Sequence, residues 1–314
     1  MHGRRWRRCD DGVGMTNPIT PEWIALDWGT SNLRGWAMQG GAVLDSARSG
    51  DGMGNLEKSG FEPALTALLA GWNVSPKTPI IACGMVGSRQ GWVEAPYRSV
   101  PCTPLSESVV RPTSDAFDVR VLPGLRQTTL SDVMRGEETQ IAGFLSLNPN
   151  WDGVICLPGT HTKWAQVSAG EVVSFETYMT GEMFSLLSTQ SVLRHSVGGE
   201  DWDAVAFDNN IEEALSKPEK LAARLFSIRA DDLLKGTSPE VSRARLSGLL
   251  IGAELSAARP YWLGMNIAII GDTSLATFYA RALGNQGVPA TIADAERMTL
   301  AGLTAAYRHT KDAR

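Results

Sequence analysis

The sequence predicts an α/β protein made of two similar domains, each with a mixed sheet covered by helices. The chain has 314 residues, and domains usually span about 150 residues. Short apolar strands alternate with helical segments along most of the chain, which is typical of mixed sheets. The opening pattern of the chain also returns at residue 153, and an internal repeat decides the architecture.

The repeat is a strand–turn–strand–turn–strand pattern at the start of each half. At a constant spacing of about 130 residues, Gly29-Thr30 falls on Gly159-Thr160 and Gly40 falls on Gly170. Apolar runs bounded by Gly, Asn and Ser turns are typical of such hairpins. The strands are expected over 22–27, 33–38 and 42–48, and again over 153–157, 163–167 and 171–178.

The other expected elements follow from hydrophobic periodicity and breaker residues. Further strands are expected over 79–83, 119–122, 266–270 and 288–293. Helices are expected over 61–71, 131–147, 181–194, 211–227, 238–259, 274–283 and 294–308. Residues 84–105 are too rich in Gly and Pro for one long element.

Domain limits follow from these elements and from one breaker sequence, Asn148-Pro149-Asn150. Residues 1–20 are expected to be a disordered or mis-started leader, although its arginines leave a basic arm or a targeting segment open. No apolar stretch follows those arginines, so a secretory signal is not supported. The remaining divisions are 21–150, 151–295 and a C-terminal helix, 296–314, packing back on the domain junction.

Composition excludes several classes of protein. A net charge of −5 disfavours a nucleic-acid binder, and no apolar run of about 18 residues is present for a membrane span. The four cysteines have no CxxC spacing and the four histidines are scattered, which disfavours a zinc or histidine metal site. These features favour a reducing, cytoplasmic location; a homodimer is left open.

The turn after the first strand can bind a phosphate. Gly29 lets the backbone approach an anion, and successive N–H groups of a tight turn form an anion-binding concavity. Thr30 and Ser31 add hydroxyl donors, while Asp27 at the strand end can hold Mg²⁺ together with phosphates. The alternative is a plain hairpin turn that Asp27 caps.

The corresponding turn in the second half offers Gly159, Thr160 and Thr162. Two such loops facing each other could hold adjacent phosphates of one nucleotide. His161 is either a general base or simply a hydrogen-bonded loop histidine, and Lys163 is either a phosphate contact or a strand residue.

A third turn, Gly271-Asp272, follows an apolar strand. A glycine there lets a flat nucleoside lie against the backbone. A simple turn between strand and helix is the alternative.

Together these loops resemble a known superfamily. Asp27 to Arg34, with the pattern D-x-G-T-S-x-x-R, resembles the first phosphate motif of sugar kinases, actin and heat-shock chaperones. Residues 157–160 resemble the second phosphate motif, and residues 267–272 resemble the adenosine motif. The resemblance implies two ribonuclease-H-like α/β domains with mixed sheets and an ATP cleft between them.

Longer stretches resemble one family more closely. Residues 82–97, 135–140, 157–164 and 179–182 look like those of 2-dehydro-3-deoxygalactonokinases. The resemblance implies a carbohydrate kinase that uses ATP and Mg²⁺ in galactonate breakdown. Its small-molecule substrate would be 2-dehydro-3-deoxy-D-galactonate, phosphorylated at the 6-hydroxyl.

Acidic residues before the second phosphate loop are candidates for the catalytic base. The superfamily often places an acidic residue at the start of this helix, and here Glu138 or Glu137 is favoured, with Asp132 as the rival. A carboxylate of this kind orients the attacking hydroxyl. The alternative is that these residues only complement the positive helix N-terminus.

A sugar acid needs a cation for its carboxylate, and arginine binds carboxylates with two hydrogen bonds. Arg89 in the irregular stretch is the first candidate; the alternative is a structural loop with solvated arginines. The full set of expected substrate residues is Ser88, Arg89, Gln90, Trp92, Glu94, Arg98 and Glu182.

Two other functions fit the nucleotide loops. An exopolyphosphatase-like phosphohydrolase would use Glu137 or Glu138 to activate water, and would release phosphate without an acceptor. A non-catalytic ATP-gated binding module would keep the nucleotide loops but would need no polar acceptor pocket.

Overall fold

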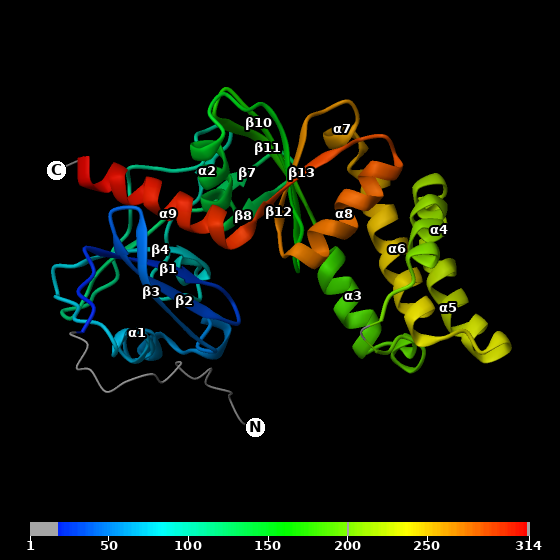
Figure 1. The fold of residues 1–314 in the computed structure, drawn as a ribbon, viewed down its shortest axis with the longest axis horizontal. Helices are drawn as coiled ribbons and strands as arrows, with labels where there is room; N and C mark the ends of the chain where they lie inside the picture. Colours follow the sequence, from blue (N-terminus) through cyan, green and yellow to red (C-terminus); the bar gives the residue numbers. More distant parts are fainter. Residues whose placement is uncertain (1–17, 200, 313–314) are drawn as a thin grey trace.

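The structure is a computed structural model that describes residues 18–199 and 201–312. Figure 1 shows two lobes, each built on its own sheet, with a group of helices extending from the second lobe. Most of the expected leader, residues 1–17, lies outside the described residues. Within 1–20, the Ile19 carbonyl accepts a hydrogen bond from Asn73 N at 2.8 Å, so the first lobe includes residues before 21.

The first lobe is built on a five-stranded sheet in the order β3-β2-β1-β4-β6. The first three strands pair antiparallel, whereas β4 and β6 run parallel to β1. The hairpin between β2 and β3 turns at Gly40, which takes a positive φ of 56° that favours glycine. The strands are β1 (Trp23–Trp28), β2 (Leu33–Gln39), β3 (Ala42–Ser49), β4 (Pro79–Gly84) and β6 (Asp118–Val121).

The second lobe repeats this topology. Its sheet has the order β11-β10-β9-β12-β13, with the same sequence of antiparallel and parallel pairs. The predicted fold class, two similar α/β domains with mixed sheets, is therefore confirmed. The strands are β9 (Gly153–Leu157), β10 (Thr162–Ser168), β11 (Glu171–Tyr178), β12 (Ile267–Gly271) and β13 (Ala290–Asp294).

Two helices lie between the sheets: α2 (Glu137–Leu147) and α9 (Ala295–Asp312). Ile141 and Phe144 of α2 pack on the second sheet, whereas Ala142 packs with the first. In Figure 1, α9 leaves the second lobe and crosses over the first. There Tyr307 stacks on Trp23 of β1, with ring centroids 4.5 Å apart. The helices α2 and α9 thus contribute side chains to the cores of both lobes.

The other helices cover the outer faces. One face of the first sheet is covered by α1 (Phe61–Leu69). In the second lobe, α6, α7 and α8 pack on the sheet, whereas α4 packs on the outer side of α6 and lies beside α5 at the edge of the molecule. Helix α3 packs against α6. Their bounds are α3 (Thr180–Thr189), α4 (Ala204–Ser216), α5 (Leu221–Lys235), α6 (Pro239–Ala257), α7 (Arg259–Trp262) and α8 (Thr273–Asn285).

Two expected helices differ from the structure. The helix expected over 131–147 begins only at Glu137, because residues before Gly136 form a strand of a small third sheet. The helix expected over 211–227 is wrong: α4 ends at Ser216, and α5 begins at Leu221 after a break that includes Pro218. The strands of the third sheet are β5 (Arg98–Ser99), β7 (Leu125–Gln127) and β8 (Asp132–Met134).

No helix within residues 18–199 and 201–312 combines the length and the apolar character that crossing a membrane requires.

Candidate active site

A polar hollow of about 500 Å³ lies between the lobes and joins the two Gly-Thr loops. Thr160 lines it from the second lobe, opposite the first phosphate loop. The first loop is a tight turn, in which Gly29 N donates to Asn32 O at 2.9 Å. The hollow is lined by Asp27, Gly29, Thr30, Ser31, Asn32, Arg34, Arg48 and Thr160.

Asp27 ends β1 at the wall of this hollow. Its carboxylate accepts a hydrogen bond from Arg34 on the neighbouring strand and faces the Cys83 thiol, 3.9 Å away. Arg34 also lies 3.9 Å from the Glu296 carboxylate in the first turn of α9. The structure thus brings Asp27 and Arg34 together with the loop, as the sequence motif implied.

Close backbone contact places the start of α2 beside Asp27. Gly84 and Gly136 have positive φ angles of 90° and 109°. A Cβ atom on Gly136 would lie 3.4 Å from Gly84 Cα, and one on Gly84 would lie 2.7 Å from Trp28 O and 3.3 Å from Asp27 Oδ1. Only glycine suits both positions. The first turn of α2 therefore lies against the ends of β1 and β4.

Glu138 is buried in this junction, with a 1% exposed side chain. Its Oε2 accepts from Gly136 N at 2.7 Å, and its Oε1 accepts from Thr139 Oγ1 at 3.1 Å. Burial and the neighbouring charge of Glu137 raise the pKa of Glu138 to about 8. Burial disfavours the charged form of a carboxyl group, so Glu138 takes up a proton near neutral pH.

Glu137 faces the second lobe and is more accessible, with a 27% exposed side chain. One carboxylate oxygen accepts from Arg135 N at 3.0 Å, and the other lies 3.8 Å from Lys163 Nζ. Lys163 itself is buried. This ion pair joins the start of α2 to β10, so Lys163 acts at least as a partner of Glu137.

Asp132, the third acidic candidate, lies apart from this arrangement. It belongs to β8 instead of a helix start, and its Oδ1 accepts from Thr177 Oγ1 of β11 at 2.7 Å. The expectation that it begins the helix is therefore wrong. In this structure its carboxylate joins β8 to β11.

The second phosphate loop is held by the start of α3. Glu182 N donates to Thr160 O at 2.9 Å, and a Cβ atom on Gly181 would lie 2.2 Å from Gly159 O. The Glu182 carboxylate lies 2.6 Å from His161 Nε2. His161 and Glu182 thus form a pair at the edge of the loop.

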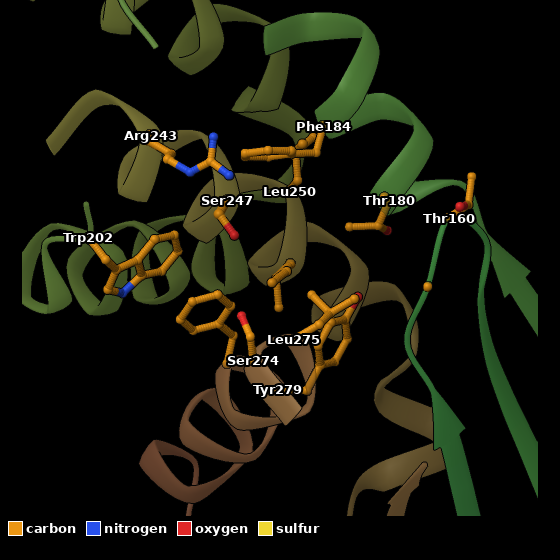
Figure 2. A pocket seen from close by; sticks show the side chains of 14 residues that line it. Thr160, Thr180, Phe184, Trp202, Arg243, Ser247, Leu250, Ser274, Leu275 and Tyr279 are labelled. Carbon is orange, nitrogen blue, oxygen red and sulfur yellow. The ribbon is translucent and has the colours of Figure 1, made fainter. Parts of the chain in front are cut away.

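A second hollow, of about 430 Å³, opens where α3, α6 and α8 meet (Figure 2). Ser274 and Leu275 point into it from the first turn of α8, and Asp272 caps that helix by accepting from Ser274 N at 3.0 Å. The size and the mostly apolar lining are typical of a small-molecule site. The other lining residues are Gly159, Thr160, Thr180, Gly181, Phe184, Trp202, Arg243, Ser247, Leu250, Ile251, Phe278 and Tyr279.

Thr160 lines both hollows, so the apolar hollow and the polar hollow adjoin each other at the second loop. Gly271 and Asp272, the nucleoside residues predicted from the sequence, are not among the lining residues, although Asp272 caps the helix that carries Ser274 and Leu275. The opposite wall was not predicted. Trp202 stacks on Phe278 with centroids 4.0 Å apart, and the Arg243 guanidinium lies 5.1 Å from the Phe184 ring centre. These residues come from separate elements and carry no local motif.

The irregular stretch after β4 has a mixed character. Arg89 is 82% exposed and faces Glu94 at 3.6 Å, and Gln90 is exposed. Trp92 packs in the first core against Phe61 and Trp28. Ser88 is buried, and its Oγ has no hydrogen-bond partner in the structure.

Arg98 does not join the candidate site. Its guanidinium donates to the carbonyls of Thr103 and Leu105, each at 2.8 Å, and it lines a different hollow. Arg135 was missed as a candidate although it stands in the motif that contains Glu137. It is buried with its guanidinium 4.2 Å from the Tyr97 ring centre, and its Nε and one terminal nitrogen have no partner in the structure.

No cluster of three or more metal-ligating side chains is present among the described residues. A lone aspartate beside a phosphate hollow nevertheless fits Mg²⁺, which is usually held by one or two carboxylates together with substrate phosphates. Asp27 is the residue that would hold such an ion.

The lobes and their paired Gly-Thr loops define a protein of the sugar kinase and actin-like class. The activator of 2-hydroxyisocaproyl-CoA dehydratase from Clostridium difficile shares this fold, with a TM-score of 0.51 at 12% identity. It covers 93% of this chain and 96% of its own. The model of the 2-keto-3-deoxy-galactonokinase family matches residues 27–306, and the chain belongs to this family.

Relatives within the family are similar along most of their length. A protein of Rhizobium meliloti (strain 1021), named probable 2-dehydro-3-deoxygalactonokinase, is 39% identical over 91% of this chain and 96% of its own. The 2-dehydro-3-deoxygalactonokinase of Escherichia coli (strain K12) is 36% identical over 91% and 97%. A crystal structure from Sinorhizobium meliloti, described with the same kinase name, has a TM-score of 0.86 at 37% identity, covering 91% and 98%.

Proposed function

We propose that the protein transfers the terminal phosphoryl group of ATP to the 6-hydroxyl of 2-dehydro-3-deoxy-D-galactonate, giving the 6-phosphate and ADP. The observation that carries this proposal is that the two hollows meet at Thr160, while a pair of carboxyl groups stands at the start of α2. A nucleoside, its phosphates and an acceptor hydroxyl could thus be aligned in that order. Family membership supports the choice of substrate.

The nucleotide would lie along the second loop. The nucleoside suits the mostly apolar hollow beside α8, and the phosphates suit the polar hollow that Thr30, Ser31 and Thr160 line. Arg34 adds a cation at the same wall. A Mg²⁺ ion held by Asp27 would neutralise part of the negative charge of the phosphates.

Glu137 is the residue best placed to accept the proton of the acceptor hydroxyl. Its carboxylate is partly exposed, whereas that of Glu138 is buried. When two carboxyl groups lie close together, their environments separate their acid and base roles. The raised pKa of Glu138 keeps that residue neutral near pH 7, whereas the Glu137 carboxylate lies 3.8 Å from the Lys163 ammonium group.

The acceptor would lie between α2 and the stretch after β4. Ser88 offers a buried hydroxyl without a partner. Arg89 offers a guanidinium for the substrate carboxylate, provided that it turns inward from its exposed position when the substrate binds.

The proposal is tested by measuring ADP release by the purified protein with ATP and Mg²⁺. Three reactions are compared: no acceptor, 2-dehydro-3-deoxygalactonate, and its gluconate epimer. ADP formation that depends on the acceptor and is fastest with the galactonate form is expected. Equal ADP release without any acceptor would instead favour a phosphohydrolase or an ATP-gated module. Failure of both acids to support turnover would overturn the substrate assignment.

A further inference from the structure

A buried carboxylate that the mechanism above does not use lies behind the second phosphate loop. Glu254 of α6 is 3% exposed, and no lysine or arginine in the described ranges forms an ion pair with it. Its Oε1 accepts from Trp164 Nε1 at 2.8 Å, and its Oε2 accepts from Tyr279 OH at 2.8 Å. The hydroxyl groups of Thr162 and Thr180 lie near enough to lower its pKa, against the effect of burial.

The residues around this carboxylate come from the elements that build the nucleotide site. Thr162 begins β10 directly after the second phosphate loop, and its hydroxyl also lies 3.0 Å from Tyr279 OH. Thr180 begins α3 and Tyr279 belongs to α8, and both line the apolar hollow. Figure 2 shows Thr180 and Tyr279 on opposite sides of that part of the hollow. Glu254 thus joins α6 to β10 and α8 through one side chain.

Such a group is costly to keep in a protein core. Moving a carboxylate from water into the interior costs several kcal/mol unless it is paired or fully hydrogen-bonded. An apolar residue would fill the same space without this cost. The hydrogen bonds fix the directions of Trp164 and Tyr279, and through Tyr279 that of Thr162. A satisfied buried network makes a core rigid and unique.

We propose that Glu254 is a positioning residue for the nucleotide, and this inference rests on the proposed use of ATP. It fixes the phosphate loop Gly159–Thr162 relative to the apolar hollow, so that one nucleotide can occupy both at once. Glu254 is not among the residues that line either hollow, and it acts through Trp164 and Tyr279, the second of which holds Thr162.

The test is Glu254→Gln, a substitution of nearly the same shape. Glutamine keeps one acceptor oxygen but turns an NH₂ group toward hydroxyl and indole donors, so part of the network is lost. The KM for ATP is expected to rise about tenfold, which corresponds to about one lost hydrogen bond. The KM for the acceptor should change by less than about threefold, since the acceptor contacts belong to the first lobe.

Nucleotide binding measured by calorimetry separates positioning from general stability, and it does so without turnover. The ratio of the adenosine Kd to the ADP Kd reports how much the phosphates add to binding. In Glu254→Gln this ratio should fall about tenfold, the same loss as in the KM. An unchanged ratio, with both ligands weakened equally, would overturn the proposal.

Two further variants complete the experiment. Tyr279→Phe removes one donor from the network and should lower the same ratio to a smaller extent, which keeps the proposal testable if Glu254→Gln folds poorly. Glu213→Gln is the matched control, because Glu213 lies on α4 of the same lobe and pairs with Arg224 away from the site. A ratio that falls equally in the control would also refute the assignment. If the wild type had no kinase activity but the binding ratios changed as expected, only the proposed function would be refuted.

Discussion

At the scale of single residues, two adjacent glutamates with the same side chain have different properties. Glu137 and Glu138 begin one helix, but successive helical positions point about 100° apart. One carboxylate therefore faces Lys163 across the lobes, and the other is buried against Gly136 and Thr139. The sequence predicted that one of them acts as the base but could not choose, because burial depends on how α2 packs.

The choice can be tested by kinetics. Glu137→Gln should lower kcat by about 10²- to 10⁴-fold, the usual effect of removing a general base. The KM for ATP should change little. Glu138→Gln should lower kcat far less, because its buried carboxyl group is already neutral near pH 7. The assignment is reversed if Glu138→Gln is the inactive variant and Glu137→Gln retains more than about a tenth of the activity.

Buried carboxyl groups also predict how stability depends on pH. The pKa of Glu138 is raised to about 8 and that of Glu254 to about 7, each mainly by burial. The folded protein holds these protons more tightly than the unfolded chain, so their contribution is fully present below about pH 4.5. It is lost as the pH rises through about 7 to 8.

Glu138→Gln removes one of these titrating groups and should therefore become more stable relative to the wild type as the pH rises. Urea unfolding at pH 5 and pH 9 measures the difference. Since a tenfold change in proton affinity equals about 1.4 kcal/mol, the relative gain should reach at least about 1 kcal/mol. A difference in unfolding free energy that stays constant from pH 5 to pH 9 would show that Glu138 does not titrate as described.

At the scale of elements, the sequence predicted most strands well because apolar runs and glycine turns are local signals. The helix start at Glu137 was missed, since Asp132 to Met134 form a strand only by pairing with β7. That pairing is a tertiary contact without a local signal. The apolar hollow also has no local sequence signal, because Trp202 and Arg243 come from separate elements.

Close packing of α2 on α9 is another feature that the sequence did not reveal. A Cβ atom on Gly143 would lie 1.9 Å from Met298 O, and one on Gly302 would lie 1.9 Å from Thr139 O. Each helix thus presents a glycine to the backbone of the other. Glycine inside a helix costs about 0.5–1 kcal/mol relative to alanine, and here it permits the two helices to approach closely between the sheets.

At the scale of the whole molecule, both lobes contribute to the polar hollow, whereas the apolar hollow belongs to the second lobe alone. One ion pair, between Glu137 and Lys163, joins the start of α2 to β10. Another, between Arg34 and Glu296, joins β2 to α9. A ligand that reaches the polar hollow therefore contacts both lobes. A ligand confined to the apolar hollow contacts only one.

Hydrogen exchange should show this difference directly. Adenosine is expected to slow exchange around residues 273–279 in the second lobe and to leave residues 29–34 unchanged. ATP with Mg²⁺ should slow exchange in both segments, because its phosphates extend past Thr160 to the first loop. Helix α5 (Leu221–Lys235), which contributes to neither hollow, is the internal control. If ATP protected only the second lobe, the phosphates would not be held between the lobes, and an alignment of ATP with an acceptor at Glu137 would have to be abandoned.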